Sequence, residues 1–148
     1  MILDYDLIDK IIYNHKFKFI SINHDYSSKK FLSKRRRNHV KKCIEQACRS
    51  SMRCKHGSVA VLNDEIVAEG CNVMENDSDD ATHFSLHAEV NAIQQCKKKK
   101  LNTKEIDIYV VRLKTRNRKI VGLYNSDPCL NCFRMMAIKY SFRNVISS

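Results

Sequence analysis

Apolar residues recur with two different periods along the chain, and together these periods predict an α/β protein. Apolar residues spaced three or four apart predict amphipathic helices near residues 3–12, 34–49, 86–96 and 129–139. Alternating or continuous apolar runs rich in β-branched residues predict strands near residues 17–21, 58–62, 66–69, 106–113, 119–124 and 144–146. The polar residues 23–30 are predicted to form a loop. From residue 34 onward, the order of elements predicts one mixed sheet with helices on its faces.

The chain has 148 residues, a length that suits one domain around a single hydrophobic core. Residues 1–33 carry no recognisable chemistry, so we expect them to be an N-terminal extension. The candidate chemistry lies farther along the chain, and residues 34–148 are therefore predicted to form the functional domain.

Targeting signals and cysteine usage bear on the compartment. The start of the chain, from Met1 to Asp6, lacks the basic residues and apolar run of a signal peptide. No stretch approaches the ~18 consecutive apolar residues that cross a bilayer. The seven cysteines are an odd number, which favours reduced thiols over a disulfide framework. We therefore expect an intracellular, cytoplasmic protein with no membrane partner.

The chain is strongly basic, with a formal net charge of +11. Such a charge favours anionic partners, among them nucleotides and nucleic acids, through long-range attraction. The most basic run, Lys34-Arg35-Arg36-Arg37, opens a predicted helix. A solvated helix end is favoured over a nucleic-acid-binding patch for this run, and the basic surface leaves a nucleic-acid partner as an alternative.

Two short segments carry the candidate chemistry. The first contains His87 and Glu89 in the first turn of a predicted helix, and the second contains Cys129 and Cys132 directly after Pro128. One histidine and two cysteines make three protein ligands for Zn²⁺ and leave the fourth tetrahedral position for water, as in catalytic zinc sites. Two thiolates three residues apart in a first helical turn converge on one ion and are stabilised by the helix dipole.

Glu89 is the candidate catalytic residue. Zinc lowers the pKa of bound water toward ~7, and a carboxylate two residues from a histidine ligand can reach that water and the substrate ring. We expect Glu89 to carry protons from the water to a ring nitrogen and to departing ammonia. Structural zinc would need a fourth ligand, and a redox role for the two cysteines would leave His87 and Glu89 unexplained.

The two motifs together resemble those of the zinc-dependent cytidine and deoxycytidylate deaminase superfamily, over about residues 38–147. The resemblance implies a three-layer fold with a mixed sheet and helices on both faces, a zinc cofactor and a homo-oligomer. It also implies substrate-binding roles for Asn72, which ends a Gly-x-Asn motif, for the Ala88 backbone and for Ser126. Asn91, which follows the pattern of deoxycytidylate deaminases, is a further expected substrate-binding residue. The segment 114–124 is longer than the usual link to the cysteine helix.

The leading hypothesis is therefore an enzyme, a hydrolase of C–N bonds in cyclic amidines. It would convert a cytosine nucleoside or nucleotide, such as cytidine, CMP or dCMP, to the uracil product and ammonia. Asp127 before Pro128 is acidic as in tRNA adenosine deaminases, which leaves an adenosine or other base deaminase acting on tRNA or nucleic acid as an alternative. An inactive zinc-bearing binding module is a third hypothesis, against which the intact Glu89 argues.

Overall fold

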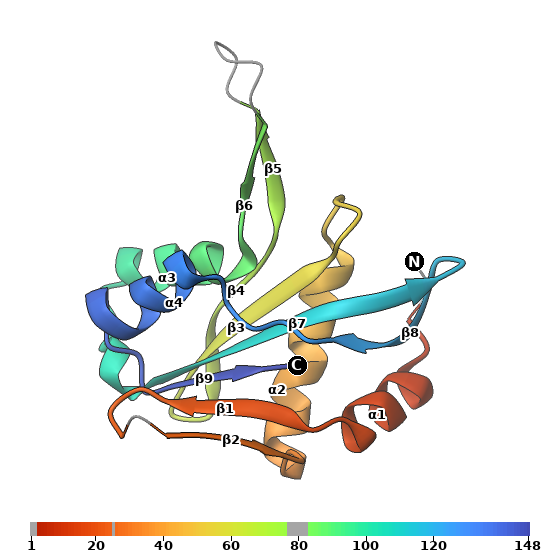
Figure 1. Ribbon diagram of the computed structural model, residues 1–148, viewed down its shortest axis with the longest axis horizontal. Helices are drawn as coiled ribbons and strands as arrows, with labels where there is room; N and C mark the ends of the chain where they lie inside the picture. The colour runs from red at the N-terminus through yellow and green to blue at the C-terminus, as the bar shows by residue number, and fades with distance from the viewer. Residues whose placement is uncertain (1–2, 25, 77–82) are drawn as a thin grey trace.

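The computed structural model describes residues 3–24, 26–76 and 83–148. Its helices are α1 (Tyr5–Asn14), α2 (Lys34–Cys48), α3 (Ala88–Lys98) and α4 (Leu130–Arg134), with a 3-10 turn at Thr103–Glu105 and a π-helical turn at Met135–Lys139. The main sheet contains β1 (Phe17–Ser21), β2 (Tyr26–Lys30), β3 (His56–Leu62), β4 (Glu65–Cys71), β7 (Ile106–Arg116), β8 (Lys119–Tyr124) and β9 (Asn144–Ser147). A separate hairpin of β5 (Val73–Asn76) and β6 (His83–Leu86) projects from the sheet (Figure 1).

The main sheet is mixed, with the strand order β2-β1-β9-β7-β3-β4. Strands β7 and β9 pair in parallel and the other pairs are antiparallel. The long strand β7 changes partner halfway along one edge, because residues 107–110 pair with β9 and residues 112–116 pair with β8. The β7–β8 hairpin therefore extends the sheet beyond the end of β9 (Figure 1).

Helices cover both faces of the sheet. Alternate side chains of β3 and β7 point to opposite faces, so Val59 and Tyr109 pack with the core residues of α1 and α2, whereas Ala60 and Ile108 pack with those of α3 and α4. This arrangement confirms the predicted three-layer α/β fold. No helix within the described ranges is long and apolar enough to span a membrane.

The described part of the N-terminal region packs into the same core. Phe17 and Ile12 are fully buried, and β1 pairs antiparallel with β9. The predicted loop at residues 23–30 is wrong for Tyr26–Lys30, which forms β2. An edge strand with little buried surface carries no alternation of apolar residues, so the sequence pattern missed it. The division of the chain at residue 34 stays a prediction.

The basic run at the start of α2 is largely held against the protein's own polar groups. Arg36 donates a hydrogen bond to the Tyr109 hydroxyl at 2.8 Å and lies 3.5 Å from Asp107, while Arg35 lies 3.3 Å from Asp64. Arg37 donates to the Leu32 carbonyl oxygen at 2.9 Å. These contacts attach the helix end to the sheet.

Gly57 allows β3 to approach α2 very closely. A Cβ atom on Gly57 would lie 2.0 Å from the backbone oxygen of Cys43 and 2.6 Å from the backbone nitrogen of Ala47. We expect Gly57→Ala to lower the free energy of unfolding by about 3 kcal/mol, at the upper end of overpacking effects, because backbone atoms cannot move aside. Gly122→Ala is the matched control, since its nearest contact would be 3.7 Å. Urea denaturation measures both variants, and equal stabilities would contradict the expectation.

Candidate active site

Two helix beginnings meet on one face of the sheet. His87 is the N-cap residue of α3, and Cys129 is the N-cap residue of α4, where its sulfur accepts a hydrogen bond from the Cys132 backbone N–H at 3.4 Å. Both N-cap residues have extended backbone angles, so their side chains turn back over the first helical turn. Cys132 follows Cys129 by three residues, so the two side chains lie on the same side of α4.

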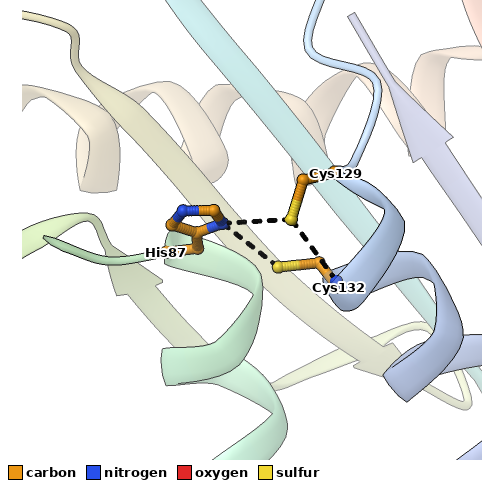
Figure 2. A group of neighbouring side chains, drawn as sticks. All are labelled: His87, Cys129 and Cys132. Atoms are coloured by element: carbon orange, nitrogen blue, oxygen red, sulfur yellow. Dashed lines mark hydrogen bonds between the residues drawn. The ribbon is translucent and has the colours of Figure 1, made fainter. Parts of the chain in front are cut away.

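The three candidate ligands converge on one point (Figure 2). The Nδ1 atom of His87 lies 3.2 Å from the sulfur of Cys132 and 3.5 Å from the sulfur of Cys129. All three donor atoms lie within 4.8 Å of one another. In a tetrahedral zinc site, Zn–N and Zn–S bond lengths place nitrogen and sulfur ligands about 3.5 Å apart. The donor set and its spacing therefore fit Zn²⁺.

The site's electrostatics favour a cation at this point. Burial raises the pKa of the Cys132 thiol, and the nearby Glu89 carboxylate raises it further. The positive end of the α4 dipole acts in the opposite direction and favours thiolates at the helix start. A cation bound between the two sulfurs would stabilise both as thiolates, which zinc requires of its cysteine ligands.

Glu89 lies in the first turn of α3 and is only 5% exposed. Burial raises the pKa of its carboxyl group, while its own backbone N–H, the charge of His87 and a hydrogen bond with Cys132 act in the opposite direction. The carboxyl group is thus beside the donor atoms and largely shielded from water. A buried carboxyl with a raised pKa is suited to proton transfer.

A pocket of about 300 Å³ opens over this cluster. That volume is at the small end of the range found for small-molecule sites, ~300–1,000 Å³. Its walls come from the loop before β3, the end of β4, the first turn of α3 and the segment before α4, namely Met52, Cys54, His56, Asn72, His87, Ala88, Glu89, Ser126, Asp127 and Cys129. The structure thus brings Asn72, Ala88 and Ser126, which the family resemblance implied, next to the candidate ligands.

Asn72 uses its amide group to hold one wall of this pocket. Its side-chain oxygen accepts a hydrogen bond from the His56 backbone N–H at 2.9 Å. Its side-chain nitrogen donates to the Cys54 carbonyl oxygen at 2.6 Å and to the Met52 sulfur at 3.3 Å. A buried asparagine with these partners fixes the loop that carries Met52 and Cys54.

Ser126 is similarly held by backbone. Its hydroxyl donates to the Val110 carbonyl oxygen at 2.9 Å and accepts from the Ser148 backbone N–H at 3.0 Å.

Asn91 lies elsewhere: its side-chain nitrogen donates to the Cys71 carbonyl oxygen at 3.3 Å, and it packs against Gly70. Among the described residues that line the pocket, Asn91 is absent, and its substrate contact stays a prediction.

Sequence reasoning missed part of the pocket wall. Met52 and Cys54 lie in a loop without regular structure, where no periodic pattern marks a residue as functional. Asp127 was noted for its acidity, but its partners were not foreseen: it lies 3.3 Å from the Lys18 ammonium and accepts a hydrogen bond from the Ser147 hydroxyl at 3.3 Å. Lys18 comes from β1, so the N-terminal region contacts a residue that lines the pocket.

Comparison with known proteins identifies the class. The cytidine and deoxycytidylate deaminase zinc-binding region matches residues 33–148, and the chain belongs to this family. The dCMP deaminase of cyanophage S-TIM5 in its apo form shares the fold with a TM-score of 0.52 and 23% identity, over 71% of this chain and 75% of the phage chain.

A second solved structure gives the same picture. A cytidine deaminase from Burkholderia pseudomallei has a TM-score of 0.50 and 20% identity, over 66% of this chain and 70% of its own. Identities this low establish the fold alone. No curated protein sequence gives a significant match.

The Asn72 contacts predict a measurable dependence of stability on this side chain. We expect Asn72→Ala to lower the free energy of unfolding by about 2 kcal/mol, because the substitution removes a buried side chain and leaves the partly buried backbone groups of His56 and Cys54 without these partners. Asn91→Ala serves as the control, since it removes one longer hydrogen bond at a half-buried position. Chemical denaturation compares the two variants, and a larger loss for Asn91→Ala would contradict the assignment.

Proposed function

We propose that this chain is a zinc-dependent hydrolytic deaminase acting on the cytosine ring of a nucleoside or nucleotide. The observation that carries the proposal is the convergence of one imidazole nitrogen and two sulfurs beside the buried Glu89, at the base of a pocket of about 300 Å³. Family membership supports the same reaction class. The cyanophage S-TIM5 enzyme, a dCMP deaminase of the same fold, has been crystallised in complex with dCMP and dUMP.

His87, Cys129 and Cys132 would hold the zinc ion. Bound there, zinc would supply a Lewis acid that makes water nucleophilic at neutral pH. The three side chains would fill three positions of a tetrahedral zinc site, which would leave the fourth for water. The first turns of α3 and α4 would hold the three metal-binding side chains in fixed orientations. Because these helices are part of the packed core, the side chains would keep their orientations when the substrate enters.

Glu89 would move the protons of the reaction. Water adds its oxygen to the ring carbon that bears the amine, and Glu89 takes the proton that this oxygen loses. The carboxyl group delivers this proton to the adjacent ring nitrogen. It then takes the remaining proton from the newly formed hydroxyl group and passes it to the amine, so that the C–N bond breaks and the products are the uracil ring, with its new carbonyl, and ammonia. Burial of Glu89 excludes bulk water from this transfer.

The pocket wall would position the ring through groups that are already fixed. The Ala88 backbone N–H lies in the first turn of α3, where amides have no partner within the helix. Ser126 and Asn72 add polar atoms that are held in place by their hydrogen bonds. We also propose, from the family resemblance, that the chain forms a homo-oligomer and acts in the cytoplasm.

The alternative of a base deaminase for tRNA or other nucleic acid rests on Asp127 and on the basic composition. Asp127 does line the pocket, but its carboxylate is already paired with Lys18 at 3.3 Å. The basic run at the start of α2 belongs to the other face of the sheet, which separates it from the pocket. We therefore favour a mononucleotide or nucleoside as the substrate over tRNA or another nucleic acid.

Loss of any proposed ligand should remove the metal. We expect His87→Ala, Cys129→Ser and Cys132→Ser each to weaken zinc binding by more than ~100-fold, because even supporting residues of such sites contribute 10- to 100-fold. Cys71→Ser is the matched control, since Cys71 lies outside the cluster. Competition with a chromogenic chelator measures affinity. Zinc retention by all three ligand variants would contradict the assignment.

The reaction itself is tested by ammonia release. The zinc-loaded protein is incubated with dCMP, CMP, deoxycytidine and cytidine, and at least one of them should yield ammonia and the uracil product. Glu89→Gln should lower kcat by about 10²- to 10⁴-fold, the usual contribution of a proton-transfer group, with zinc content unchanged. No ammonia from any substrate would overturn the proposed reaction, and zinc loss in Glu89→Gln would overturn the role of Glu89.

A further inference from the structure

A row of polar and aromatic side chains leads from the pocket onto the β7–β8 hairpin. Arg112 of β7 is paired with His56 of β3 on one side and with Tyr124 of β8 on the other. Directly opposed residues in antiparallel strands share a face of the sheet. Because His56 lines the pocket, Arg112 and Tyr124 lie on the pocket's face, and Lys114 follows on that face two residues along β7.

The Arg112 guanidinium lacks an anionic partner. Its Nε atom is buried without a hydrogen-bond partner, and its Nη2 atom donates to the sulfur of Cys54 at 3.6 Å. Among the described residues, no carboxylate lies within 4.0 Å of Arg112 or of Lys114. A guanidinium has five N–H donors, and burying its charge is unfavourable unless an anion or several acceptors compensate.

Neighbouring groups hold this guanidinium in place. Its central carbon lies 4.9 Å from the centre of the Tyr124 ring, and the Lys114 ammonium lies 5.6 Å from the same ring. Cation–π attraction of this kind restricts both side chains. The Ser148 hydroxyl accepts from the Arg112 backbone N–H at 3.2 Å and donates to the Tyr124 carbonyl oxygen at 2.7 Å, which joins the two strands at this level.

Arg112 is also next to the pocket. Arg112 contacts the sulfur of Cys54 and pairs with His56 of β3, and both of these residues line the pocket. Burial lowers the pKa of His56, and the charges of Arg112 and His87 lower it further. The guanidinium adjoins the pocket through its contact with Cys54.

We propose that Arg112, together with Lys114 and the Tyr124 hydroxyl, binds a phosphate group attached to the sugar of the substrate, so that the enzyme acts on a nucleotide in preference to a nucleoside. This inference rests on the proposed function and names its substrate class. A guanidinium presents parallel N–H donors that match phosphate oxygens, and an ammonium and a phenol complete such a site. The phosphate belongs either to a free mononucleotide or to a single strand, and both present the same chemistry.

The longer segment at residues 114–124 supplies most of this site. Lys114 and Tyr124 lie at its two ends, and the hairpin that it forms places them beside Arg112. Tyr124 is 44% exposed, so its hydroxyl remains accessible to a ligand. The hairpin therefore extends the sheet on the pocket side with two cations that have no carboxylate partner within the described residues.

The test compares substrates that differ only in phosphate. Steady-state deamination of dCMP and deoxycytidine is measured for the unmodified protein and for Arg112→Gln. We expect Arg112→Gln to raise KM for dCMP by about 10- to 100-fold, the range for hydrogen bonds to a charged group. The value of kcat and the kinetics with deoxycytidine should stay nearly unchanged, since a remote binding contact is lost equally from ground and transition states.

Lys119→Gln is the matched control. It removes one positive charge from the same hairpin, but Lys119 pairs with Arg116 at the far end of the hairpin and lines a groove beside α1, away from Arg112. Its kinetics should match those of the unmodified protein. If Arg112→Gln fails to fold, as judged by circular dichroism, the exposed Lys114→Gln carries the test, with an expected three- to tenfold rise in KM for dCMP.

Further measurements separate the outcomes. A short oligonucleotide with one central deoxycytidine identifies the source of the phosphate: preference for it over dCMP, abolished by Arg112→Gln, assigns the site to a single strand. Equal kcat/KM for dCMP and deoxycytidine, or equal losses for both in Arg112→Gln, would overturn the phosphate site while leaving the deaminase reaction standing.

A binding measurement covers the case in which no substrate is deaminated. Calorimetry with dUMP and deoxyuridine then tests the site without turnover. Tighter binding of dUMP that is lost in Arg112→Gln would keep the phosphate site and reject the proposed reaction. Equal affinities for the two uracil compounds would reject the phosphate site.

Discussion

The packing of α3 and α4 against the same face of the sheet is the constraint on which the rest of the site depends. Ala92 and Ile93 from α3 share one buried cluster with Cys132 from α4 and with Met136 from the π-helical turn that follows it. His87 and Cys129 are 42 residues apart in the chain, so only this packing brings their donor atoms to 3.5 Å. Interiors are close-packed and deform little, and therefore the ligand geometry is inherited from the core.

Sequence patterns predicted a mixed sheet with helices on its faces and the donor set, because both leave local signals, and the family resemblance implied the three layers. A proline before a cysteine marks a helix start, and two cysteines three residues apart there lie on one side of the helix. The partners of each pocket residue leave no such signal. Lys18 is 109 residues from Asp127 in the chain. Their ion pair follows from the pairing of β1 with β9, and the spacing of apolar residues does not indicate which strands pair.

Asn72 and Asn91 show how a resemblance assigns importance without assigning a role. Both are polar residues in the motifs that carry the resemblance, yet each directs its side-chain amide to backbone groups of the protein. Asn72 fixes the loop before β3, and Asn91 ties α3 to the end of β4. Buried amides that satisfy backbone groups stabilise a single arrangement of a pocket wall. These residues thus determine the shape in which the Ala88 amide and Glu89 are presented.

The distribution of charge is more informative than its sum. The net charge of +11 indicates an anionic partner but no location, and several cations are engaged within the protein, since Arg36 and Arg143 both approach Asp107 and Lys18 approaches Asp127. Arg112 differs because its guanidinium is partly buried beside the pocket and contacts a thiol and an aromatic ring in place of a carboxylate. A positive charge held in that environment is stabilised best by an anion that arrives with the ligand. The β7–β8 hairpin, which extends the sheet, is therefore the part of the fold that would meet the negative charge of the substrate.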